Sequence, residues 1–270
     1  MRRRFGQTLR IGIAPGALAL ASCARWGGAA PTVVAQLEID SNGGAAALGA
    51  GLRQLLGEAA AKHWPASVIV ADELARMWQV VPPAGAARMA DLEGAAALRF
   101  QALFGEPAGG WKMAAGWDAL HPFVAAALPQ PLLAQIGQSA SEHQLALVAV
   151  VPQFVASFNR WRGALRGGAW FGQVHAGVLT LGATDGQRLL AVRAAALPAG
   201  ANAEWLAEHV AREALRLNLA PPARLQLAGP APAAWNSSAG VLACTLLDAG
   251  QAQGGTLSDA ARLALTGIAA

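Results

Sequence analysis

Short apolar stretches alternate with amphipathic stretches along the whole chain. The apolar stretches are bounded by turn-forming residues and have the length of buried strands, whereas the amphipathic stretches repeat their apolar residues at helical spacing. In the first half this pattern predicts strands at 10–13, 17–22, 32–39, 68–71, 77–81, 124–128 and 145–151. It predicts helices at 45–62, 88–104, 132–144 and 153–165.

A second series begins at residue 169 and has the same order of elements. It predicts strands at 169–174, 178–181, 189–195 and 225–228, turns at 175–177 and 185–186, a helix at 203–219, and two closing segments at 241–247 and 257–265. Asn202 can cap the helix. Three strands followed by helix and strand pairs, twice over, indicate an internal duplication, with lobes at 9–168 and 169–270.

This duplicated order resembles the actin-like superfamily, which implies a ribonuclease H-like α/β fold with mixed sheets flanked by helices. The resemblance rests on IGIAPG at 11–16, VAVVP at 148–152, VLTL at 178–181 followed by TDG at 184–186, and AALPAG at 195–200. It covers roughly residues 9 to 235. Within the superfamily, the chain is similar above all to actin-like assembly proteins of type IV pili and to cytoplasmic domains of type II secretion platform proteins.

The resemblance also implies where a nucleotide would bind. In working members, two hairpins hold the phosphates, each begins with an acidic residue that positions Mg²⁺, and a glycine turn packs on the adenosine. Here the acidic positions fall on Ala14 and Gln173, and Pro230 replaces a glycine of the adenosine turn. The glycines of these motifs are still present at Gly12, Gly16, Gly177 and Gly229, but the geometry of hairpin turns is a sufficient reason for them. We therefore expect a vestigial site that binds neither ATP nor Mg²⁺, and no catalysis.

Composition indicates a packed globular protein and argues against several other classes of function. Hydrophobic residues make up 54% of the chain and charged residues 13%. The formal net charge is +4, but the arginines are scattered, so we expect no nucleic-acid binding. Cys23 and Cys244 stand far apart without a CxxC pair, and no stretch is apolar and unbroken enough to predict a membrane span. His209 lies among charged residues and is expected to be solvated.

Two further groups of residues are candidates for chemistry or partner binding. Asp72 and Glu73 could form a catalytic carboxylate pair, but a solvated edge after a buried strand, with Arg76 near enough to pair, is the simpler interpretation. Trp78 follows Arg76 closely, and Trp161 lies between two arginines, as tryptophans of protein interfaces often do. Arg76, Trp78 and Trp161 are therefore predicted partner contacts.

The first residues allow two interpretations. An apolar run from Arg10 to Cys23 follows three arginines, and its end, LASC, resembles the cleavage box of a bacterial lipoprotein. The same run also fits two strands folded at Pro15-Gly16. Cleavage before Cys23 would remove two strands that the third strand needs as neighbours, which favours the folded interpretation.

The sequence thus predicts a non-catalytic actin-like scaffold of a type IV pilus or type II secretion platform. Its expected partners are inner-membrane assembly proteins, one of which would donate a short cytoplasmic peptide to a groove. We expect a cytoplasmic protein, peripheral to the inner membrane, that reaches the membrane only through a partner. The alternatives are an active actin-like ATPase or kinase and an exported lipoprotein anchored through Cys23.

Overall fold

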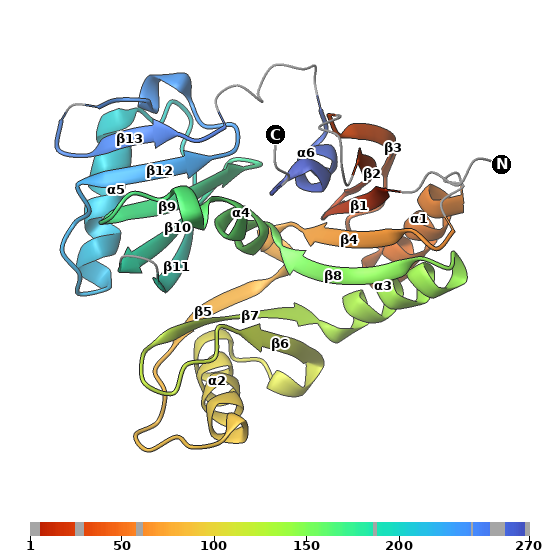
Figure 1. The fold of residues 1–270 in the computed structure, drawn as a ribbon, viewed down its shortest axis with the longest axis horizontal. Coiled ribbons are helices and arrows are strands. Elements are labelled where there is room, and N and C mark those ends of the chain that lie inside the picture. The colour runs from red at the N-terminus through yellow and green to blue at the C-terminus, as the bar shows by residue number, and fades with distance from the viewer. Residues whose placement is uncertain are drawn as a thin grey trace.

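Two lobes and a small subdomain make up the structure (Figure 1). The computed structural model describes residues 6–24, 30–57, 62–185, 188–238, 240–248 and 257–267. Each lobe is built on a five-stranded sheet, and the subdomain is built on a three-stranded sheet. The expected α/β architecture, with mixed sheets flanked by helices, is confirmed.

The first sheet has the strand order β3-β2-β1-β4-β8. Its strands are β1 (Gln7–Ala14), β2 (Ala17–Ala24), β3 (Thr32–Glu38), β4 (Pro65–Val70) and β8 (Ala146–Pro152). Ala14 lies opposite Ala17, so Pro15 and Gly16 form the turn between β1 and β2, and the predicted hairpin is confirmed. β1 is a central strand, because it pairs antiparallel with β2 and parallel with β4.

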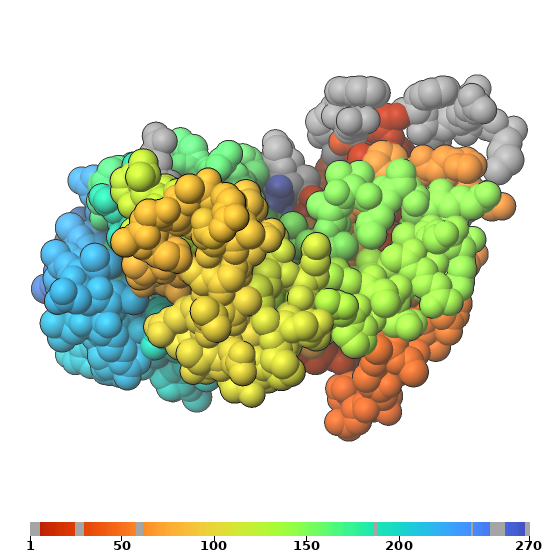
Figure 2. Space-filling model, turned by 90° about the horizontal axis from the view of Figure 1, so that it is seen from below, coloured from red at the N-terminus to blue at the C-terminus, as the bar shows by residue number. Residues whose placement is uncertain are grey.

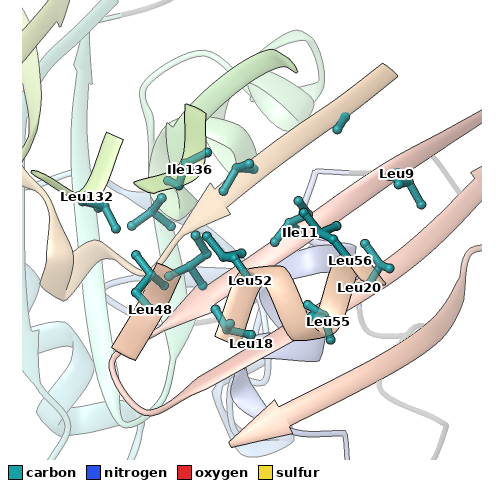
Figure 3. Packing of buried hydrophobic residues seen from close by; sticks show 14 of the residues in the cluster. Leu9, Ile11, Leu18, Leu20, Leu48, Leu52, Leu55, Leu56, Leu132 and Ile136 are labelled. Atoms are coloured by element: carbon teal, nitrogen blue, oxygen red, sulfur yellow. The ribbon is translucent and has the colours of Figure 1, made fainter. Parts of the chain in front are cut away.

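The large residues of this sheet pack against helices α1 (Gly44–Gly57) and α3 (Gln130–Glu142). In β1 and β2 large residues alternate with small ones, so Ile11, Leu18 and Leu20 lie on the same face. Figure 3 shows these three side chains meeting the leucines of α1. Apart from Arg10, the residues at the centre of the opposite face of the hairpin are small: Gly12, Ala14, Ala17, Ala19 and Ala21.

The second sheet repeats this plan with the order β11-β10-β9-β12-β13. Its strands are β9 (Ala169–His175), β10 (Val178–Asp185), β11 (Arg188–Ala196), β12 (Arg224–Ala228) and β13 (Ala243–Leu246). Helix α5 (Ala203–Arg216) covers one face with Leu206, Val210 and Ala214. The Asn202 side chain accepts a hydrogen bond from the Trp205 amide (2.9 Å) and caps this helix, as predicted.

The subdomain lies between β4 and α3 in the sequence. It contains β5 (Arg76–Val80), α2 (Met89–Phe104), β6 (Trp111–Ala115) and β7 (Phe123–Pro129), with the strand order β5-β7-β6. The sequence pattern predicts β5, α2 and β7 but misses β6, whose side chains are only half buried or exposed. In Figure 2, which shows the molecule from below, the subdomain (light orange and yellow) stands in the foreground between the blue second lobe and the green part of the first lobe.

Two helices are exchanged between the lobes. Helix α4 (Gln153–Trp161) follows the last strand of the first sheet but packs on the second, where Phe154 and Phe158 contact Phe171 with ring centroids 5.6 and 5.7 Å apart. Helix α6 (Asp259–Leu265) ends the described chain and packs on β1 and β2 (Figure 1). Residues 257–265 therefore do not belong to the second lobe as we expected but cover the first.

The small face of the β1–β2 hairpin explains where α6 lies. Ala14 and Ala19 contact the alanines of α6, and a Cβ atom on Gly12 would lie 1.9 Å from the Ala260 carbonyl oxygen. A larger side chain would thus push the helix away. Arg10 donates from Nε to the Ala264 carbonyl (2.8 Å) and from its guanidinium to Thr266, which satisfies carbonyls at the end of the helix.

A few expectations fall partly outside the described residues. These are the end of the helix predicted at 45–62, the basic start of the chain and one residue of the turn at 185–186. The last part of the helix predicted at 153–165 is a 3₁₀ turn, Arg162–Ala164. None of the helices in the described ranges is both long and apolar enough to span a membrane.

Candidate functional site

A small cavity lies between the lobes where the sequence places the second hairpin and the adenosine turn. Gln173 and His175 of β9 line it together with Gly229 and Pro230, which follow β12. Side chains of α4 and residues of the α6 segment close it from the other side. Of the six predicted vestigial positions, the structure brings Gln173 and Gly229 to this cavity, whereas four do not line it: Gly12, Ala14, Gly16 and Gly177.

The cavity has a volume of about 120 Å³. Pockets that bury small-molecule ligands usually measure about 300–1,000 Å³. A nucleotide would therefore need the lobes or α6 to move. The first hairpin contributes nothing to the cavity because α6 covers Ala14.

Gly229 lies in a turn, and its backbone amide already donates hydrogen bonds to a side chain of the protein. Its φ of +87° and a hypothetical Cβ only 2.1 Å from the Val174 carbonyl oxygen explain why glycine is needed here. The Gly229 amide donates to both carboxylate oxygens of Asp248 (2.8 and 3.1 Å). Burial raises the pKa of Asp248 above its ordinary value, while this amide acts in the opposite direction. Pro230 has no amide hydrogen to offer a ligand.

His175 is buried on β9 without a hydrogen-bond partner for either ring nitrogen. Only 5% of the residue is exposed, and this burial lowers its pKa. Glu73 and Asp259 act in the opposite direction, and Arg262 lowers the pKa further. The imidazole is therefore favoured in its neutral form at the junction of the lobes.

Asp72 joins the first lobe to α4 and to the second sheet. One carboxylate oxygen accepts from the Phe154 amide (3.0 Å), and the other from the Thr180 hydroxyl on β10 (3.3 Å). Desolvation raises its pKa to about 7 despite these hydrogen bonds. The interpretation as a solvated edge was therefore wrong for Asp72, and Arg76 does not pair with it but with Glu106 (3.5 Å).

A groove with a volume of about 610 Å³ lies elsewhere in the described structure. Its walls come from β6 and β7 of the subdomain, from β8 and α4, and from the start of β11. Most of its lining is apolar and includes Val124, Val150 and Val155. The sequence predicted a groove but not its place, because the walls come from segments far apart in the chain.

The three predicted partner contacts have different surroundings, and none of them lines this groove. Trp78 is 2% exposed and packs edge-on against Phe100 (5.2 Å) in the subdomain core, so it cannot be a surface contact. Arg76 is partly exposed and lies over the Trp111 ring (5.3 Å). Trp161 is partly buried beneath the guanidinium of Arg160 (4.8 Å).

His209 differs from the expectation in a similar way. It is buried and stacked on Trp205, with ring centroids 5.0 Å apart and an interplanar angle of 7°. Its neighbours in sequence are charged, but its position on α5 turns it inward. In the part of the chain that the structure describes, no three His, Cys, Asp or Glu side chains come together as a metal site.

The two duplicated lobes, the exchanged helices and the hairpins at their junction define an actin-like ATPase fold. Among solved structures, the chain is similar to a Bacteroides thetaiotaomicron protein with actin-like ATPase fold and unknown function, at 12% identity over 84% of each chain with a TM-score of 0.57. It is also similar to the cytoplasmic domain of EpsL, an inner-membrane component of the type II secretion system of Vibrio cholerae. That match has 12% identity, covers 90% of this chain and 86% of that chain, and has a TM-score of 0.55.

A third similar structure is the PilM–PilN type IV pilus biogenesis complex, at 19% identity over 78% of this chain and 66% of that chain, with a TM-score of 0.49. No protein-family model matches the chain. No curated protein sequence matches it either.

Proposed function

We propose that this protein is a non-catalytic actin-like scaffold of a type II secretion or type IV pilus assembly platform. Its work would be to bind partner proteins at the cytoplasmic face of the inner membrane. The similarity to the cytoplasmic domain of EpsL supports this role, since it extends over most of both chains. At 12% identity that similarity defines the fold, and the role rests on the geometry of the cleft and the groove.

The residues of the interlobe cleft support the proposal that the protein does not bind or hydrolyse a nucleotide. Ala14 and Gln173 occupy the positions where Mg²⁺ would need carboxylate oxygens. The Gly229 amide is already bonded to Asp248, and the remaining cavity is smaller than a typical ligand pocket. These residues do not fit a magnesium–nucleotide complex, and we assign neither ATP nor Mg²⁺ as a cofactor.

The large groove supports the partner-binding role and is the observation that carries it. Among the described strands, β8 pairs with β4 alone and forms one edge of the first sheet, so the other side of its backbone makes no ladder with a described strand. Val148 on this strand is 66% exposed, while Val150 and Val151 line the groove. An extended peptide can add to such an edge and place alternate side chains in the groove. We assign the groove to a short cytoplasmic peptide of an inner-membrane partner.

Substitution within the groove tests this assignment. Fluorescence anisotropy would measure binding of labelled peptides copied from the cytoplasmic segments of the inner-membrane assembly proteins of the same genome. One of these peptides should bind the wild-type protein, and Val155→Arg should weaken that binding at least about tenfold, because the new side chain fills the groove with charge. Val34→Arg, on the far edge of the same sheet, is the control and should leave binding unchanged.

The assignment fails if no such peptide binds. It also fails if folded Val155→Arg protein, checked by circular dichroism, binds as tightly as the wild type.

An active actin-like ATPase or kinase is the second candidate, and Asp72 is the observation in its favour. A carboxyl group with a pKa of about 7 beside the interlobe cleft could act as a general base. Both of its oxygens, however, already accept hydrogen bonds from Phe154 and Thr180. A calorimetric titration with Mg-ATP separates this candidate from the scaffold.

A further inference from the structure

The small sheet of the subdomain has two faces with different neighbours. Side chains alternate along a strand, so Trp111 and Met113 of β6 turn toward the core that this sheet forms with α2. The residues between and after them turn to the opposite face. Residues of β6 and β7 on this opposite face line the large groove, namely Lys112, Ala114, Val124, Ala126 and Leu128. The face of the sheet away from α2 is therefore the floor of the groove.

The register of β6 and β7 arranges this floor in rows. Lys112 lies opposite Leu128, and Ala114 lies opposite Ala126. Val124 begins the next row along β7. Successive rows are about 6.6 Å apart along the strands, and alternate side chains of an extended peptide have the same spacing, so three of them can face the three rows. Both side chains of the middle row are methyl groups, which leaves the most room for a peptide side chain there.

The row at Lys112 is the positive end of the groove. Lys112 is exposed, and among the described residues it has neither an ion pair nor a hydrogen bond. Helix α3 begins two residues after Leu128, and within the described structure its first turn has no acidic residue and no capping side chain. Leu133 of this turn lines the groove. An ammonium group and a helix N-terminus thus lie at the same end of the groove, and both favour a negative group on a partner.

The opposite end of the groove is close to neutral. Leu189 packs in one cluster with Val124, and Arg188 beside it lines this end. Because β6 runs from Lys112 toward the same end, Asp118, which follows the strand, lines the groove there and offsets the charge of Arg188. The Asp118 carboxylate also accepts hydrogen bonds from two amides of the turn that follows it (2.8 and 3.0 Å). The positive charge of the lining is therefore concentrated at the α3 end.

We propose that the groove selects an extended peptide in which an aspartate or glutamate lies two residues from a large apolar side chain. The carboxylate would lie beside Lys112 and the first turn of α3, and the apolar side chain over Ala114 and Ala126. A second apolar side chain, two residues further, would face Val124. A lysine or arginine in place of the carboxylate would be rejected by the like charge of Lys112. This inference rests on the proposed partner-binding role of the groove and adds the chemistry of the peptide.

Selection from a random heptapeptide library displayed on phage tests the proposal with the purified full chain. Peptides that bind the wild type but not folded Val155→Arg protein depend on the groove. Among them, aspartate or glutamate should be enriched two residues from a leucine, isoleucine, phenylalanine or methionine. Selection against Lys112→Glu should enrich lysine or arginine at that position instead, because the charge that the peptide meets is reversed.

Fluorescence anisotropy measures the contribution of Lys112 directly. The groove-dependent peptide with the highest affinity, with both ends blocked so that no terminal charge remains, should bind Lys112→Glu at least about tenfold more weakly than the wild type. The matched control is Lys62→Glu, which changes the other lysine of the chain, exposed and outside the groove lining, and has the same effect on net charge. Its affinity should stay within about twofold of the wild type. Added salt should weaken wild-type binding.

The possible failures are distinguishable. Groove-dependent peptides without an acidic preference would overturn this proposal and leave the partner-binding role of the groove standing. Equal affinities of the peptide for Lys112→Glu and Lys62→Glu would do the same. If no peptide in the selection depends on the groove, both the proposal and the assignment of the groove to a peptide are overturned.

Discussion

Small residues decide how closely the parts of this protein approach one another. Gly12 lies under α6, where a Cβ would meet the backbone carbonyl of Ala260 at 1.9 Å. Gly182 lies under Phe154, whose ring would be 2.6 Å from an added Cβ. Each exchanged helix thus rests on a glycine of the sheet that it covers. Gly12, one of the glycines of the vestigial site, is in this way explained by helix packing.

Substitution of Gly12, compared with substitution of Gly16 in the hairpin turn, tests whether the packing of α6 requires a glycine at position 12. Gly12→Ala should lower the free energy of unfolding by at least about 2 kcal/mol, since the methyl group meets backbone atoms that cannot move aside independently. Gly16→Ala is the control: the nearest atoms to an added Cβ lie 3.8 Å away, so a change within about 0.5 kcal/mol is expected. Urea denaturation followed by tryptophan fluorescence measures both, and equal stabilities would contradict the packing described for α6.

Because the pKa of Asp72 is raised on folding, Asp72 makes the free energy of unfolding depend on pH. Its pKa is raised from 3.8 to about 7 in the folded protein, so the folded state binds the proton more tightly than the unfolded state. Stability attributable to Asp72 therefore falls as pH rises between these two values and is constant beyond them. Desolvation is the main cause, and the hydrogen bonds from Phe154 and Thr180 limit the shift.

The Asp72→Asn variant isolates this contribution. The free energy of unfolding of the wild type minus that of the variant should decrease steadily from about pH 4 to pH 7, and urea denaturation at several pH values measures it. Asp118→Asn is the control: amides of Leu120 and His121 lower the pKa of Asp118 below its ordinary value of 3.8, so its difference should rise with pH only below about pH 4 and be flat from pH 4 to pH 7. A flat or rising difference for Asp72 would contradict its desolvated position.

At the scale of the elements, sequence patterns predicted the helices and strands whose formation depends on residues close together in the chain. The Pro15-Gly16 turn within an apolar run predicted β1 and β2, and the helical spacing of leucines predicted α1. The half-buried strand β6 was missed because its pattern is short and weak. The return of α6 to the first lobe was missed because it depends on a contact between opposite ends of the chain.

The candidate site, too, could be predicted only where it depends on residues close together in the sequence. Sequence reasoning identified Gln173 and Gly229, which do meet at the cleft, but it could not show that α6 covers Ala14. Trp78 and His209 were misplaced because polar neighbours in sequence suggested exposure, whereas the fold turns both side chains inward. The groove could not be located, since its walls come from both lobes and the subdomain.

The β1–β2 hairpin favours the folded interpretation of the first residues over the lipoprotein signal. A chain without residues 1–22 would lose β1 from the middle of the first sheet and expose the apolar face of α1, so we expect it not to fold cooperatively. Cys23 itself is 7% exposed and lies in β2 opposite Thr8. Intact-mass measurement of protein from its native cells should therefore find these residues retained. A product that begins at a lipidated Cys23 would contradict this.

For the whole molecule, the exchange of α4 and α6 ties the two lobes together around a narrow cleft. The subdomain adds a third contact, because β11 of the second lobe packs against β5 and β7. The large groove opens where all three parts meet, so a peptide bound there would contact each of them. The molecule thus has a large groove where its three parts meet and only a small cavity between the lobes.

Calorimetric titration with Mg-ATP tests the central claim, that an actin-like fold here has no nucleotide chemistry. We predict no heat above dilution at millimolar nucleotide, because Ala14 and Gln173 stand where carboxylates would hold Mg²⁺ and the cavity beside Gln173 measures only about 120 Å³. The same samples, assayed for released phosphate, should show no turnover. Saturable micromolar binding accompanied by phosphate release would contradict the account.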